Sequence, residues 1–151
     1  MKPIYSTTVM LLFILNSFLG FSQENTSIKK EIFATQPNTV SIHQELFSEL
    51  MNVKAGNVIS VTFNENFIFK GIVLSNQAVN NTQQTLLIKS VEFGNAIFQL
   101  SKILLTDKSE SYVGRIISTD AEDGYMISKN IANNYQLNKI ELKNILQDCS
   151  Y

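Results

Sequence analysis

The chain has few of the residue types on which most enzyme and metal sites depend. Among its 151 residues there is one cysteine, Cys149, and one histidine, His43. A single cysteine excludes an internal disulfide, so stability has to come from apolar packing. The common zinc sites draw on several histidine and cysteine ligands, which two such residues do not supply. Because no catalytic or cofactor-binding motif stands out either, a binding domain is favoured over an enzyme.

Charge of either sign is also scarce. The chain carries 12 lysines and arginines against 13 aspartates and glutamates, a formal net charge of −1. A nucleic-acid or anionic-membrane partner needs a concentrated basic field, and Lys29 and Lys30 form the one adjacent basic pair. We therefore expect neither a nucleic acid nor a charged membrane surface as a partner.

The apolar run near the start of the chain is too short for a membrane span. Val9–Leu15 (VMLLFIL) follows the positive charge of Lys2 and is interrupted at Asn16, well short of the roughly 20 apolar residues that a bilayer demands. Small residues at Gly20 and Ser22 suit a cleavage site, and no lipid-accepting cysteine follows. The pattern predicts a signal peptide over residues 1–22 and an exported protein, periplasmic or extracellular, without a membrane anchor.

Cleavage there leaves 129 residues (151 less 22), enough for one domain with a single core. Residues 23–40 are polar and contain a proline, and we expect a flexible lead-in or at most one short edge element. Ser41 and Gln44 have the spacing of a capping box. Behind them apolar residues recur at helical spacing until Gly56, which predicts a helix over about 42–54.

From Asn57 onward the hydrophobic period changes to two, and short polar turns separate the alternating segments. The pattern predicts about seven strands, at 57–63, 67–75, 85–93, 96–105, 111–118, 124–129 and 134–141. We expect a mainly β domain over 41–151, built as an antiparallel meander that curls toward a barrel. Amphipathic spacing in LKNILQDC predicts a short C-terminal helix over about 142–149.

The strands resemble one another in a way that indicates an internal repeat. NYQLNKI at 134–140 nearly repeats IFQLSKI at 97–103, and Gly71 and Gly114 hold matching positions inside strands. Glycine within a strand marks a bulge, a bend or a close approach of backbones. We therefore expect two copies of a three-strand unit, with chance similarity between short amphipathic strands as the alternative.

The two rarest side chains have structural interpretations as well as chemical ones. His43 lies in the first turn of the expected helix, where a hydrogen-bonded histidine is more common than a metal or catalytic one. Cys149 lies on an apolar stripe after Asp148, which is no setting for a reactive thiolate. It is best interpreted as a small buried hydrophobic residue, with a disulfide-linked dimer as the next alternative.

The acidic segment TDAEDG at 119–124 is the best candidate for chemistry. Asp120, Glu122 and Asp123 lie within six residues between two expected strands. Calcium takes six to eight oxygen ligands, and a carboxylate pair serves acid–base chemistry where burial separates the two pKa values. The same residues are also typical of a solvated hairpin turn. Calcium binding here is thus a secondary prediction beside the simple turn.

These observations favour a non-catalytic exported domain that binds a protein or a glycan through a sheet edge or its loops. A secreted inhibitor or an accessory protein for another exported protein is a narrower form of that hypothesis. The enzyme alternative is a Ca-dependent or carboxylate-based hydrolase that uses the 119–124 turn.

Overall fold

Eight strands and one helix make up residues 30–143, the part of the chain that the computed structural model describes. The elements in chain order are β1 (Thr39–Ile42), α2 (Gln44–Leu50), β2 (Val58–Asn64), β3 (Phe67–Asn80), β4 (Gln83–Ser90), β5 (Ile97–Leu104), β6 (Glu110–Ile117), β7 (Asp123–Lys129) and β8 (Tyr135–Glu141). Among these residues no helix has the length and apolar character that crossing a bilayer requires.

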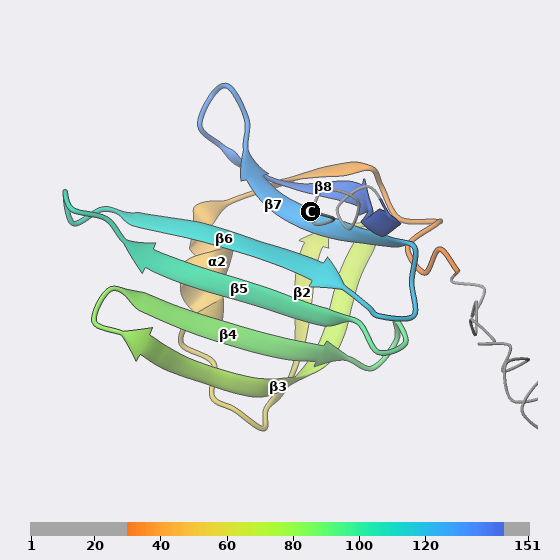
Figure 1. The fold of residues 1–151 in the computed structure, drawn as a ribbon, viewed down its shortest axis with the longest axis horizontal. Helices are drawn as coiled ribbons and strands as arrows, with labels where there is room; N and C mark the ends of the chain where they lie inside the picture. The colour runs from red at the N-terminus through yellow and green to blue at the C-terminus, as the bar shows by residue number, and fades with distance from the viewer. Residues whose placement is uncertain (1–29, 144–151) are drawn as a thin grey trace, which may run out of the picture.

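The strands form one antiparallel sheet in the order β1-β8-β7-β6-β5-β4-β3-β2. Except for β1, each strand pairs with its neighbour in the chain, as a meander does. The sheet curls until its two edge strands, β1 and β2, lie beside each other, and α2 lies behind β4–β6 (Figure 1). The predicted curled, barrel-like meander is confirmed, and its seven strands correspond to β2–β8.

The two glycines inside strands occupy places where backbones approach closely. A Cβ atom on Gly71 would lie 2.5 Å from the carbonyl oxygen of Lys89, and one on Gly114 would lie 2.5 Å from that of Gln99. Any other residue would therefore push two strands apart. Gly71 meets the strand that follows it, whereas Gly114 meets the strand that precedes it. The duplication of a three-strand unit stays a prediction.

Among residues 30–143, nine of the 22 residues in the buried apolar core are aromatic. Tyr125 packs edge-on against Phe33, with ring centroids 5.3 Å apart, and its centroid lies 5.0 Å from that of Phe67. At the other end Phe47 of α2 contacts Tyr112 and Tyr135 at centroid distances of 5.6 and 5.4 Å. The helix thus closes one end of the barrel with a side chain that is itself fully buried.

The helix α2 spans Gln44–Leu50, which is shorter than the predicted range of about 42–54, and it begins two residues later. Ser41 does not cap it, because residues Thr39–Ile42 pair with β8 and stay extended. His43 takes the N-cap position without a side-chain capping bond. At the other end the amide of Asn76 donates to the carbonyl oxygens of Met51 and Val53, at 2.9 and 2.8 Å. Strand pairing and these tertiary hydrogen bonds override the helical pattern at both ends.

Packed structure begins before Ser41, within the segment expected as a lead-in. Phe33 is completely buried, and the ammonium of Lys139 donates to the carbonyl oxygens of Phe33 and Gln36. The hydroxyl of Tyr125 donates to the carbonyl oxygen of Pro37 at 2.6 Å. Residues 30–38 therefore form a latch that joins the N-terminal segment to β7 and β8. The predicted signal peptide, residues 23–29 of the lead-in and residues 144–149 of the predicted C-terminal helix lie outside the described residues.

The latch makes stability sensitive to alkaline pH. Burial, with a smaller contribution from the charge of Asp123, raises the pKa of Tyr125 from 10.0 to about 12. The unfolded chain then loses this proton near pH 10 while the folded chain still holds it, so stability falls as pH rises between the two values. We expect a loss of about 1 kcal/mol from Tyr125 at pH 11 relative to pH 9.

Urea unfolding of the wild type and of Tyr125→Phe at both pH values measures this contribution. The phenylalanine variant lacks the titrating group, so its stability should fall less than that of the wild type over the same interval. Equal losses in the two proteins would contradict the assignment to Tyr125.

Candidate interaction site at the β7–β8 hairpin

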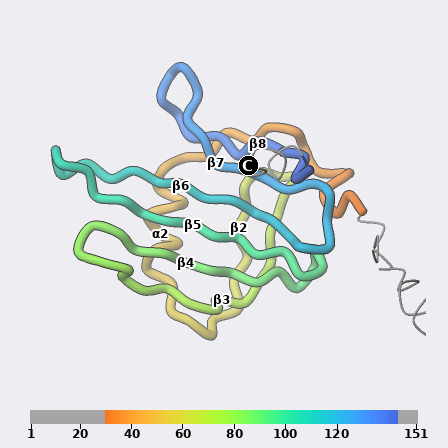
Figure 2. Tube along the Cα trace, in the orientation of Figure 1, coloured from red at the N-terminus to blue at the C-terminus, as the bar shows by residue number. Residues whose placement is uncertain are grey.

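The β7–β8 hairpin projects beyond the rest of the sheet (Figures 1 and 2). The turn between its strands, residues 130–134, is held by three hydrogen bonds that start from Asn130, Asn133 and Asn134. The backbone N–H of Asn130 donates to the carbonyl oxygen of Asn134 at 2.9 Å, and that of Asn133 donates to the carbonyl oxygen of Asn130 at 2.8 Å. The N–H of Asn134 donates to Oδ1 of Asn130 at 2.9 Å.

One residue of the turn adopts a left-handed backbone conformation. Asn133 has φ of 64°, a region that asparagine tolerates better than most residues because its side chain bonds locally. The turn is therefore ordered by its own hydrogen bonds, without help from the rest of the barrel.

Ile131 lies in this turn and is the most exposed large apolar residue of the described chain. Its relative exposure is 109%, against 73% for Val58, the next in order. Scattered apolar residues on a surface are ordinary, but a β-branched aliphatic side chain in a turn of asparagines is not what turn chemistry selects. Ile131 thus has no packing role in the folded domain.

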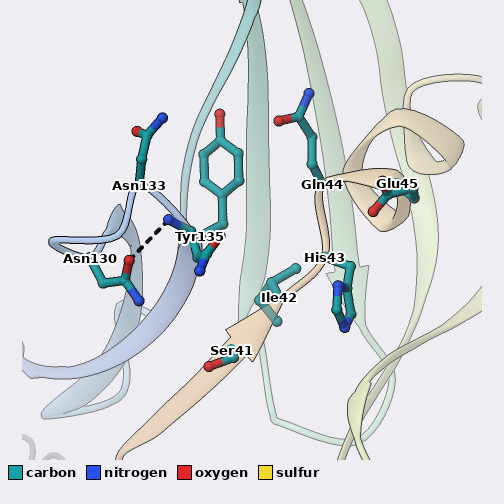
Figure 3. A pocket seen from close by; sticks show the side chains of 9 residues that line it. Ser41, Ile42, His43, Gln44, Glu45, Asn130, Asn133 and Tyr135 are labelled. Atoms are coloured by element: carbon teal, nitrogen blue, oxygen red, sulfur yellow. Dashed lines mark hydrogen bonds between the residues drawn. The ribbon is translucent and has the colours of Figure 1, made fainter.

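A polar cleft of about 330 Å³ lies between the turn and the junction of β1 with α2. Its lining residues are Ser41, Ile42, His43, Gln44, Glu45, Asn130, Asn133, Asn134 and Tyr135. In Figure 3 the Tyr135 ring lies between the asparagine turn and Gln44, whereas His43 points away from the Tyr135 hydroxyl. Most of the lining groups are amides and hydroxyls, which both donate and accept hydrogen bonds.

Tyr135 belongs to the scaffold of this cleft. It is 3% exposed, and its hydroxyl accepts the backbone N–H of Tyr112 at 2.9 Å. The Lys129 ammonium lies 4.8 Å from the ring centroid and covers it from outside. The ring is therefore not available as a stacking platform for a sugar.

Of the three acids of the 119–124 turn, Asp123 is buried, whereas Asp120 and Glu122 are exposed. Asp123 is buried, and its two oxygens accept the backbone N–H groups of Ile32 and Phe33 at 2.8 and 3.0 Å. Asp120 is exposed, where it accepts from the Asn95 amide at 3.1 Å. Within residues 30–143 no three His, Cys, Asp or Glu side chains gather in an arrangement for a metal ion. Calcium binding and the hydrolase alternative stay predictions.

Of the two rare residues, His43 belongs to the part of the chain that the structure describes. His43 is exposed and lies at the rim of the polar cleft. Cys149 lies outside the described residues, so the disulfide-linked dimer stays a prediction. Sequence reasoning did not single out Ile131, although an aliphatic residue inside the turn NIANN was a usable signal.

No protein-family model, no curated protein and no solved structure matches this chain. The functional argument therefore rests on the geometry described above.

Proposed function

We propose that the protein is an exported, non-catalytic domain that binds a partner protein through its β7–β8 hairpin. The observation that carries this proposal is the complete exposure of Ile131 on a turn that its own hydrogen bonds hold. Binding normally costs about 0.5–1.5 kcal/mol for each side chain that has to be ordered. An ordered turn avoids part of that cost, so its shape favours insertion of Ile131 into an apolar pocket of the partner.

The free energy that one isoleucine can contribute to binding indicates what kind of partner is needed. Burying one isoleucine contributes about 1.5–3 kcal/mol, whereas a micromolar complex needs about 8 kcal/mol. The remainder has to come from the polar groups around the cleft, among them Gln44, Asn133 and Asn134. A protein surface supplies both an apolar pocket and matching hydrogen-bonding groups around it.

Other partner classes fit less well. A single isoleucine buries far less apolar surface than a myristoyl chain, which by itself gives only marginal membrane binding. A glycan offers hydroxyl groups over most of its surface and leaves Ile131 without an apolar pocket. An inhibitor or accessory protein of another exported protein is the narrower form of this proposal, since such proteins bind with ordered surface loops that move little.

The test compares capture of proteins from the periplasm and medium by immobilised wild type, Ile131→Asp and Leu105→Asp. Leu105 is a matched control, because it is an exposed aliphatic residue in the turn between β5 and β6. We expect a partner that the wild type and Leu105→Asp retain and that Ile131→Asp loses at least tenfold, because a buried charge replaces an apolar anchor. Equal retention by all three proteins, or retention of nothing by the wild type, would rule the proposal out.

A further inference from the structure

The ladder between β6 and β7 is much shorter than the others in the centre of the sheet. It contains two residue pairs, Arg115 with Met126 and Ile116 with Tyr125, whereas β6 pairs with β5 at eight positions. Beyond Arg115, β7 rises away from β6 toward its hairpin (Figures 1 and 2). The backbone N–H of Tyr112 donates to the Tyr135 hydroxyl. Because β7 diverges from β6 beyond Arg115, the two strands are not hydrogen-bonded to each other there, and we call this gap in the ladder the seam.

A cleft of about 350 Å³ lies on the sheet surface at the point where the ladder ends. Apolar groups make up one part of its lining, namely Val113 and Met126, which are 46% and 40% exposed, and the buried Ile127. Met126 is unbranched and flexible, so it adapts to the shape of an alkyl chain. Arg115 and Gln99 form the polar part.

Arg115 is oriented within this cleft and keeps donors to spare. Its Nε–H donates to the Oε1 atom of Gln99 at 3.2 Å. No carboxylate of residues 30–143 forms an ion pair with it. A guanidinium carries five N–H donors whose planar geometry matches a carboxylate. The cleft therefore combines a cation with unused donors and an apolar wall next to it.

We propose that this cleft binds a medium-chain aliphatic carboxylate, with the carboxylate on Arg115 and the alkyl chain along Val113 and Met126. A peptide with a free C-terminus has the same charged group, but it also needs partners for its backbone. The N–H of Tyr112, which faces this seam, is already bonded to Tyr135. A ligand without amide groups fits the seam better. The proposal is independent of the hairpin interaction, because neither Ile131 nor the polar cleft contributes to it.

The test is a titration of the mature protein, labelled in its methionine methyl groups, with octanoate, followed by the NMR signal of Met126. We expect a saturable shift with a Kd of about 1 mM or below. Affinity should rise about twofold for each methylene from hexanoate to decanoate, as expected for half-buried CH₂ groups. Octanol should bind about tenfold more weakly than octanoate, because it lacks the charge that Arg115 recognises.

Two variants separate recognition from general surface binding. Arg115→Gln should weaken octanoate binding about tenfold and leave octanol binding unchanged. Lys89→Gln removes a charge from the exposed face of β4 and should change neither. The proposal fails if Met126 shows no saturable shift, if octanol binds as well as octanoate, or if Arg115→Gln binds like the wild type. It also fails if a short peptide with an apolar C-terminal residue binds more tightly than octanoate.

Discussion

Replacing Phe33 with alanine is expected to lower the free energy of unfolding by about 4 kcal/mol, as for other fully buried phenylalanines. The ring is inaccessible to solvent. It packs against Phe67, Phe93 and Tyr125 with centroid distances of 6.0, 4.9 and 5.3 Å. Because these neighbours belong to strands or to an ordered loop, they cannot close the cavity that the substitution leaves.

Urea denaturation of the purified protein measures this effect. Thr35→Ala is the matched control, since Thr35 is an exposed residue of the same segment and should change stability by no more than about 0.5 kcal/mol. A loss below about 1 kcal/mol for Phe33→Ala would show that residues 30–38 do not pack on the barrel as described. The same result would restore the expectation of a flexible lead-in over these residues.

The second large effect is expected at Asp123, where Asp123→Asn should destabilise the domain by about 3 kcal/mol. The carboxylate accepts the backbone N–H groups of Ile32 and Phe33, one on each oxygen. An amide has one acceptor oxygen, and its NH₂ group would face the second N–H donor. One buried N–H thus loses its partner, and the hydrogen bond that remains loses the help of the charge.

Asp120→Asn is the control for this prediction. Asp120 is an exposed residue of the same acidic turn, so its change should stay within about 0.5 kcal/mol of the wild type. Thermal or urea unfolding of the two variants side by side distinguishes them. Similar stabilities would mean that the Asp123 carboxylate does not hold the latch through Ile32 and Phe33. Asp123 would then be available as a ligand for an ion at the acidic turn.

The two proposed ligand surfaces lie on different strand pairs, β7 with β8 and β6 with β7, and β7 belongs to both. β7 ends in the hairpin that presents Ile131, and at Met126 it borders the seam with β6. Both features follow from the departure of β7 from β6 after two residue pairs. If the ladder continued, its hydrogen bonds would hold the hairpin against the sheet and close the seam.

Some elements could be predicted because their causes are local. Alternation of apolar and polar residues defines β2–β8, since each of these strands pairs with its neighbour in the chain across a short polar turn. Gly71 and Gly114 could be predicted as places where backbones approach closely, because a glycine inside a strand usually marks a bulge, a bend or such an approach. The helix was predictable in its centre, where Phe47 and Leu50 face the interior.

Other features could not be predicted because two long-range interactions competed with a local pattern. Ser41 has the spacing of an N-cap, yet pairing with Gln136 of β8 keeps it in a strand. Asp123 looks like part of a solvated acidic turn, yet it binds backbone groups some 90 residues earlier in the chain. In both places a distant segment supplies the hydrogen bonds, and no local pattern records which segment that is.

By itself the sequence determined a mainly β domain with a single apolar core, no internal disulfide and a meander of curled strands. Those properties depend on composition, on the period of the hydrophobic pattern and on turns between neighbouring strands. Only the tertiary structure decided that residues 30–38 form a latch, that β7 leaves β6 after two pairs and that Ile131 is fully exposed. The physical reason is that each of these depends on which distant groups satisfy a backbone hydrogen bond or cover a side chain, and that choice is made only when the whole barrel is assembled.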